Sequence, residues 1–560
     1  MISNPILPGF HPDPSIVRDG EDYWIATSTF EWLPGIRLHH SRDLVHWRPA
    51  GHALTRPSQI DLGGVAPSKG VWAPNLSVAD GVWYLCYSLV RNITDNYFDV
   101  DNFLVTAPAA QGPWSDPVYL NSSGFDPALF HDTDGRKWLV NLEWDYRPDH
   151  EHPGTIVLQE FSAPEGKLVG DPTPIYRGGS DLGCLEGPLL FRRGSLYYLM
   201  AAEGGTGYGH GVTLARSSSL FGPWEADPAN PIVTSAAARF HARGNPEYLK
   251  PEQFNPASSL QKSGHGSPVD TPAGEMYLAH LCARPALPQL RCVLGRETAL
   301  QKMEWTSEGW LRLSAGGNLA QTRVPEPDLP AAPWPPEPGR DDFDGPLSPH
   351  WASPRCFVDE TWVSRDRPGC VGLRGRESLF SPFQPSVLAR RVQHLDFTAA
   401  TRLVFDPRRF QESAGLVCLY DTMNFVYLRV GWNDELQTRV VEVMRADNGR
   451  REEFPGHTVA LASTAPGTEP DAVRLRVQAR GLSLNFSWAL DHSDWQALGP
   501  AFDETTLSDE YCKTGEFTGA FVGIAAQDLS RRRAWAWFDR FDYSGEPVSN
   551  QRAAETSTAR

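Results

Sequence analysis

The chain has 560 residues, and its 51 lysines and arginines against 68 aspartates and glutamates give a formal net charge of −17. An acidic chain without a basic cluster is unlike a nucleic-acid-binding protein, and no apolar run approaches the roughly 18 residues of a membrane span, so we expect neither partner. The length indicates two or more domains, and 49 glycines and 48 prolines with little helical periodicity indicate an all-β protein.

The N-terminus and the cysteines favour a cytoplasmic protein. The first residues lack the basic and apolar stretches of a secretory signal peptide. The eight cysteines are scattered and include no C-x-x-C pair. This pattern is typical of reduced, mostly buried thiols rather than of a disulfide framework, so we expect a cytoplasmic location.

Five stretches in the first half of the chain repeat one pattern. In each, a polar residue beside Pro or Gly precedes a short apolar run, a turn glycine and an aromatic strand. The turn glycines are Gly20, Gly81, Gly135, Gly194 and Gly274. A strand, a glycine turn and a second strand predict a β-hairpin, and five hairpins in series predict a five-bladed β-propeller.

The polar residues that begin the five first strands should gather at one mouth of the propeller, because innermost strands line its central channel. They are Asp13, Asn75, Asp126, Glu186 and His265. Each has an ordinary explanation taken alone, since Asp before Pro is common in turns. Three carboxylates and a histidine at one point nevertheless indicate a chemical site.

The composition changes at the end of the predicted propeller, which we place over residues 1–324. A stiff Pro-rich linker follows over 325–341. Alternating strands over 342–547 predict a β-sandwich of the jelly-roll or concanavalin-like type. The polar tail, 548–560, is predicted to be disordered.

Motifs throughout the chain resemble those of glycoside hydrolase family 43, and within it the two-domain β-xylosidases. They include His11-Pro12-Asp13-Pro14-Ser15, Gly70-Val71-Trp72-Ala73-Pro74, Ser123-Gly124-Phe125-Asp126, Leu294-Gly295-Arg296-Glu297-Thr298-Ala299 and Phe517-Thr518-Gly519-Ala520-Phe521. The resemblance implies a five-bladed propeller followed by a sandwich. This is the architecture that the repeats predict independently.

The resemblance assigns catalytic roles to the three carboxylates. Asp13 matches the general base, Glu186 the general acid, and Asp126 the carboxylate that orients the acid and tunes its pKa. An inverting glycosidase needs one protonated carboxyl and one carboxylate, and an Asp126 anion should raise the pKa of Glu186 by like-charge repulsion. Arg296 matches an arginine of the sugar pocket, where it would favour the ionised form of Asp13 and bind sugar hydroxyls.

The resemblance also implies a closed sugar pocket. Its apolar walls would be Phe30, Trp72, Phe125 and Trp144. Thr206 would be a polar contact, and Phe517 would extend from the second domain over the site. His265 matches a central histidine that in relatives can sit near a cation such as calcium, although a hydrogen-bonded core histidine fits equally well because no Ca²⁺-loop spacing is visible. No cofactor is expected to be required; a structural Ca²⁺ in the channel is the alternative.

Three segments depart from the family pattern. Leu189 stands where the family usually has histidine, so a hydrogen bond near Glu186 is expected to be missing. The stretch 242–262 is longer than usual, and the stretch 284–291 is shorter than in many relatives. Both stretches would border the leaving-group subsite and affect the preference for chain length.

The resemblance implies an inverting exo-β-1,4-xylosidase that removes xylose from the non-reducing ends of short xylo-oligosaccharides, with a side activity on α-L-arabinofuranosides. The alternatives are an enzyme that is primarily an α-L-arabinofuranosidase and a non-catalytic sugar-binding propeller. Retention of Asp13, Asp126 and Glu186 argues against the binding protein, and the sandwich counts against an endo-acting arabinanase. A homo-oligomer is expected by resemblance alone.

Overall fold

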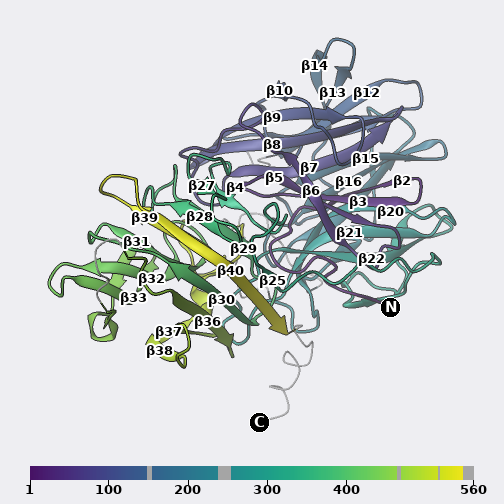
Figure 1. Cartoon of the computed structure of the whole chain (residues 1–560). Coiled ribbons are helices and arrows are strands. Elements are labelled where there is room, and N and C mark those ends of the chain that lie inside the picture. Colours follow the sequence, from purple (N-terminus) through teal and green to yellow (C-terminus); the bar gives the residue numbers. More distant parts are fainter. Residues whose placement is uncertain (148–153, 238–253, 463–467, 515–516, 547–560) are drawn as a thin grey trace, which may run out of the picture.

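The computed structural model describes residues 1–147, 154–237, 254–462, 468–514 and 517–546. The protein is all-β, and two short 3-10 helices, η2 (Pro455–His457) and η3 (Glu504–Thr506), are described beside the strands. Figure 1 shows the propeller, purple to teal, beside the sandwich, green to yellow. The predicted tail and most of the predicted insertion at 242–262 lie outside the described residues.

Five antiparallel sheets form the blades, and in each of them four strands follow one another in chain order. Blade I comprises β2 (Ser15–Asp19), β3 (Asp22–Thr27), β5 (Gly35–Ser41) and β6 (Arg48–Leu54). Blade II comprises β7 (Gly70–Ala79), β8 (Val82–Thr94), β9 (Tyr97–Ala107) and β10 (Val118–Asn121). Blade III comprises β11 (Ala128–His131), β12 (Lys137–Trp144), β13 (Gly154–Ser162) and β14 (Lys167–Tyr176). Blade IV comprises β15 (Glu186–Arg193), β16 (Leu196–Glu203), β17 (Gly211–Ser217) and β18 (Glu225–Ala226), with β19 (Val233–Thr234) added to β17. Blade V comprises β20 (Gln261–Asp270), β21 (Met276–Ala283), β22 (Glu297–Trp305) and β23 (Leu311–Leu313).

The first strands of the blades form a ring around the channel. β2 contacts β7 and β20, β11 contacts β7 and β15, and β15 contacts β20. The five predicted turn glycines all adopt positive φ, and at Gly20 a Cβ would meet no atom within 4 Å, so the backbone conformation itself favours glycine there. Pairing of β1 (Ile2–Ser3) with β24 (Arg323–Val324) joins the start of the propeller to its end.

The second domain is a sandwich of two antiparallel sheets. One sheet contains β29 (Ser386–Arg391), β39 (Phe521–Asp528), β31 (Glu412–Leu419), β32 (Phe425–Asn433), β33 (Thr438–Asp447), β34 (Arg450–Glu453) and β35 (Val459–Ala460). The other contains β25 (Arg340–Asp341), β27 (Val363–Ser364), β28 (Val371–Arg374), β40 (Trp535–Glu546), β30 (Asp396–Val404), β36 (Val473–Arg480), β37 (Ser483–Leu490) and β38 (Gln496–Asp503). Buried residues alternate along β30 and β36, as expected of strands with one face on a core.

The sandwich packs on the propeller through aromatic side chains. The rings of Trp32 and Phe521 stack with centroids 3.7 Å apart, and Phe10 and Phe30 belong to the same buried cluster. Such an aromatic pair contributes about 1 kcal/mol beyond the burial of its area. β4 (Trp32–Leu33) also pairs with β26 (Ser353–Pro354), so backbone hydrogen bonds cross the boundary. The sandwich is therefore positioned to contribute to a site on the propeller.

The linker is fixed to blade I rather than loose. Arg48 lies 3.7 Å from the ring centroid of Trp334, and the Ala332 backbone N–H donates to Asp43 over 2.8 Å. The sandwich begins with β25, two residues before the predicted boundary at 342. None of the eight cysteines forms a disulfide. Within the described ranges, no helix has the length and apolar character of a membrane span.

Candidate active site

A cavity of about 130 Å³ lies at one mouth of the channel, and its lining comes from all five blades and from the sandwich. The eleven residues that the family resemblance assigns to the site all line it: Asp13, Phe30, Trp72, Phe125, Asp126, Trp144, Glu186, Thr206, His265, Arg296 and Phe517. The structure thus brings the predicted residues together, whereas their chemical roles remain predictions.

Three of the five residues predicted to begin the first strands have unusual backbone conformations. Asp13, Asp126 and His265 have φ of 53°, 56° and 52°, in the left-handed region that few non-glycine residues adopt. Asn75 and His265 lie inside β7 and β20 and not, as was predicted, at their starts, and Asn75 does not line the cavity. Its side-chain oxygen accepts a hydrogen bond from the Leu129 backbone N–H over 3.1 Å and so joins blade II to blade III.

The Asp13 carboxylate is buried and accepts a hydrogen bond on each oxygen. Arg296 Nη1 donates to Oδ1 over 3.1 Å, and Ser28 Oγ donates to Oδ2 over 2.7 Å. Both donors hold the carboxylate in one orientation. This arrangement suits a group that accepts a proton from a water molecule.

Glu186 and Asp126 are carboxyl groups with raised pKa values. Burial raises the pKa of Glu186 well above its usual range, and the neighbouring Asp126 and Asp13 raise it further. Burial also raises the pKa of Asp126 to about 6, with the nearby His265 opposing the shift. The Gly187 backbone N–H donates to Asp126 Oδ2 over 2.9 Å, which holds Asp126 beside the acid. Burial is the larger cause of the raised pKa of Glu186, and like-charge repulsion from Asp126 is the smaller one.

A second histidine near the acid was missed in the sequence. His210 Nδ1 lies 3.9 Å from Glu186 Oε1, and burial, followed by His265, lowers the pKa of His210 to about 3, so the imidazole is neutral. Gly264 makes room for it, since a Cβ there would lie 1.7 Å from the His210 ring. The loop before β17 thus brings a histidine near Glu186, while Leu189 packs among apolar side chains.

The apolar wall extends beyond the residues predicted for it. Phe98 packs against Trp144 and Phe125, with ring centroids 4.6 Å and 5.4 Å apart. Further apolar lining comes from Ile93, Leu142, Cys184 and Leu185. Phe98 lies near the hairpin between β8 and β9, and nothing in its local sequence indicates how far that hairpin reaches toward blade III.

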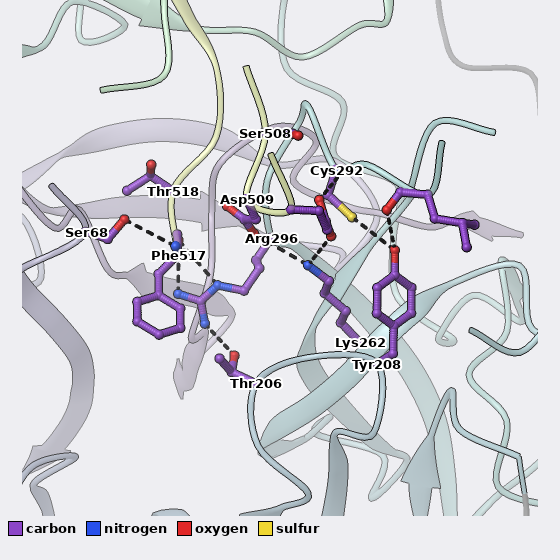
Figure 2. Close-up of polar contacts among 12 residues, drawn as sticks. Ser68, Thr206, Tyr208, Lys262, Cys292, Arg296, Ser508, Asp509, Phe517 and Thr518 are labelled. Atoms are coloured by element: carbon purple, nitrogen blue, oxygen red, sulfur yellow. Dashed lines mark hydrogen bonds and ion pairs between the residues drawn. The ribbon is translucent and has the colours of Figure 1, made fainter. Parts of the chain in front are cut away.

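Arg296 is held from both domains (Figure 2). Its Nη1 donates to Thr206 Oγ1 over 2.8 Å, and its Nη2 donates to the carbonyl oxygen of Phe517 over 3.1 Å. The guanidinium also lies 5.4 Å and 5.3 Å from the ring centroids of Phe30 and Phe517. Its position in the cavity therefore depends on the sandwich segment that carries Phe517.

The channel below the cavity narrows to a hollow of about 20 Å³ lined by Asn75, Asp126 and His265 among others. In the part of the chain that the structure describes, no three His, Cys, Asp or Glu side chains are grouped to hold a metal ion. Calcium takes roughly six to eight oxygen ligands. The side chains at the hollow do not fit that demand.

Chelation tests this assignment. We expect dialysis against EDTA to leave both kcat/KM on an aryl xyloside and the melting temperature unchanged. The reason is that carboxyl side chains alone supply the predicted acid and base. Loss of activity that added Ca²⁺ restores would contradict the expectation and show that a cation is required.

Most of the chain is similar to known proteins. The family described as glycosyl hydrolases family 43 matches residues 2–311, and the beta-xylosidase C-terminal concanavalin A-like domain matches residues 340–544. The solved xylan beta-1,4-xylosidase from Bacillus halodurans C-125 is 49% identical, with a TM-score of 0.89 over 97% of this chain and 100% of that chain. A xylan 1,3-beta-xylosidase from Vibrio sp. is 41% identical over 97% of this chain and 99% of its own. Xylosidase/arabinosidase 43B from Humicola insolens is 42% identical, with 97% of each chain covered.

The fold, the cavity and these matches show that the protein is a glycoside hydrolase of the β-xylosidase type. The chain belongs to glycosyl hydrolase family 43 and carries the concanavalin A-like domain of that family's β-xylosidases. The predicted family and all-β architecture are confirmed.

Proposed function

We propose that the protein is an inverting, exo-acting β-1,4-xylosidase that releases xylose from the non-reducing ends of short xylo-oligosaccharides. One observation carries the proposal: Asp13, hydrogen-bonded by Arg296, and Glu186, with its raised pKa, line the same cavity. A carboxylate and a protonated carboxyl in one pocket are what glycoside hydrolysis requires, and inversion in addition places a water molecule between the carboxylate and the sugar.

In the proposed reaction, Glu186 gives its proton to the glycosidic oxygen as the bond from that oxygen to the anomeric carbon breaks. A water molecule attacks the anomeric carbon from the opposite face and passes a proton to Asp13. The sugar leaves as α-xylose, and the shortened oligosaccharide leaves with the hydroxyl that Glu186 protonated. Arg296 would bind sugar hydroxyls while it orients Asp13.

The contribution of the sandwich supports exo action. Phe517 lines the cavity beside Phe30 and Trp72, with ring centroids 6.2 Å and 5.5 Å away. An aromatic side chain that reaches over the propeller mouth from another domain shortens the space available to a polysaccharide. A cavity of this kind suits a terminal sugar.

Two finer alternatives follow from the similar proteins. The name of the Humicola insolens relative includes arabinosidase activity, and a furanose can present similar hydroxyls to the same pocket. The Vibrio relative is named for a β-1,3 linkage. We place the β-1,4-xyloside first because the solved structure at 49% identity is named for it.

Proton NMR of freshly mixed β-1,4-xylobiose tests the proposal. We expect the α-anomer of xylose to appear before mutarotation, and faster turnover than with β-1,3-xylobiose. With the leaving group held constant, we expect faster turnover of 4-nitrophenyl β-xyloside than of 4-nitrophenyl α-L-arabinofuranoside. If the β-anomer appears first, the reaction retains configuration and the water-activating role of Asp13 is wrong. If the arabinofuranoside turns over faster, the arabinosidase alternative replaces the proposed substrate.

The alkaline limb of the pH profile should report Glu186. Its pKa is raised, so the acid form persists at a pH where an ordinary glutamate is ionised, and activity is lost as pH rises through that raised pKa. Asp126→Asn removes a neighbouring negative charge and should move this limb of kcat/KM to lower pH. A limb that stays in place or moves to higher pH would contradict the coupling between the two groups.

A further inference from the structure

A buried lysine of the propeller lies at the domain boundary, outside the sugar cavity (Figure 2). Lys262 Nζ is 2.7 Å from Glu510 Oε1 and 3.5 Å from Asp509 Oδ2, and the lysine and aspartate side chains are fully buried. The ammonium also lies 5.3 Å from the ring centroid of Tyr208. Lys262 belongs to β20, the strand that carries His265, whereas both carboxylates belong to the sandwich segment between η3 and β39.

Such a group is costly to bury, because all three charges lose their hydration. A buried ion pair therefore adds little stability compared with apolar packing, and its best-attested use is to fix one arrangement among several. The group around Lys262 joins the two domains at the level of the active site.

One connection runs from Asp509 to the segment that carries Phe517. Tyr420 donates its hydroxyl hydrogen to Asp509 Oδ1 over 2.6 Å, and the Thr518 backbone N–H donates to the Tyr420 oxygen over 3.4 Å. Thr518 follows Phe517 directly, so Lys262 is connected through two side chains to the backbone that lies over the cavity.

A second connection runs from Glu510 to the turn before Arg296. The Cys292 backbone N–H donates to Glu510 Oε2 over 2.7 Å, and the Gly295 N–H closes the turn on the Cys292 carbonyl over 3.0 Å. Gly295 has φ of 70°, and a Cβ there would lie 2.3 Å from the carbonyl oxygen of Thr518. The two segments held by the carboxylates are therefore in direct contact.

Both connections meet at the Arg296 guanidinium. Its Nε and Nη2 donate to the carbonyl oxygen of Phe517 over 3.4 Å and 3.1 Å. The Phe517 backbone N–H in turn donates to Ser68 Oγ over 3.2 Å. A shift of the Phe517–Thr518 backbone would therefore move the group that binds Asp13.

We propose that Lys262 is a positioning residue for the sugar pocket. By binding Asp509 and Glu510 across the domain boundary, it fixes the Phe517–Thr518 segment, and through the Phe517 carbonyl it orients Arg296. The inference rests on the proposed role of Arg296 in binding the terminal sugar. It assigns to the sandwich an active part in setting the geometry of the pocket.

A purely structural role for Lys262 predicts a different result from a positioning role. Lys302 offers a matched control, since its Nζ lies 2.6 Å from Glu275 Oε1 in the same blade, away from the sandwich. We expect Lys262→Met to lower kcat/KM on xylobiose at least tenfold, mainly through a higher KM. The assay is run at a temperature well below the melting temperature of the variant. Lys302→Met should stay within twofold of wild type.

A double-mutant cycle shows whether the effect passes through Arg296. Arg296→Lys keeps a positive charge near Asp13 but removes the two-pronged contact with the Phe517 carbonyl. In that background we expect Lys262→Met to cost less than threefold. Tyr420→Phe, which removes one connection with a small change of volume, should show the same non-additivity if Lys262→Met does not fold.

Two results would overturn the inference. One is unchanged kinetics in both Lys262→Met and Tyr420→Phe, and the other is an equal loss in the wild-type and Arg296→Lys backgrounds. Activity of the wild-type chain on xylosides is measured first. Its absence would instead overturn the proposed function, and the inference that rests on it.

Discussion

Replacing Glu186 with alanine is expected to lower kcat/KM on xylobiose by roughly 10²–10⁴-fold, the usual contribution of a general acid. The departing sugar oxygen is a poor leaving group unless it is protonated. A 2,4-dinitrophenyl xyloside has a leaving group that departs as a stable anion, so Glu186→Ala should retain far more of its activity on that substrate. The alkaline limb of the pH profile should also disappear.

Glu304→Ala provides the control for this experiment, because Glu304 is an exposed glutamate on β22 of the propeller. Steady-state kinetics on both substrates, with melting temperatures for each variant, separate loss of chemistry from loss of fold. Equal losses on xylobiose and on the dinitrophenyl xyloside would remove Glu186 from the acid role.

Replacing Asp13 with alanine should reduce turnover of both substrates, by an amount on the order of 10³-fold, because neither leaving group removes the need to activate water. Sodium azide attacks without giving up a proton. In Asp13→Ala, azide should restore turnover of the dinitrophenyl xyloside and yield α-xylosyl azide, since it enters from the face that water uses.

Asp19→Ala is the matched control, since Asp19 is exposed at the far end of β2. The azide product is identified by its anomeric proton in NMR. Formation of β-xylosyl azide, or full turnover without azide, would show that Asp13 is not the group that activates water. Melting temperatures are needed here as well, because Asp13→Ala leaves the buried Arg296 with fewer partners.

Much of the propeller could be predicted because its signals are local. Each hairpin has its turn glycine and its aromatic strand within a short window, and the carboxylates Asp13, Asp126 and Glu186 precede or begin first strands. Propeller symmetry then places residues at equivalent positions near one axis. Asn75 shows the limit of that reasoning, since it has an equivalent position but its side chain joins two blades.

The remaining features depend on contacts between distant parts of the chain. His210 approaches Glu186 from a loop, and its approach depends on the absence of a side chain at Gly264. Burial, the main cause of the raised pKa of Glu186, is a property of the assembled cavity. Phe517 was assigned by resemblance alone, and no local pattern connects Lys262 with Asp509, which lies in the other domain.

The hydrogen bonds from Arg296 to the Phe517 carbonyl oxygen also affect when the pocket can form during synthesis of the chain. The two residues are separated by 221 positions, and the residues between them form most of the sandwich. A ribosome that has released the whole propeller has not yet made the residue that completes its pocket. We therefore expect nascent chains that end before β39 and β40, the last strands of the sandwich, to lack the turnover of chains that include them.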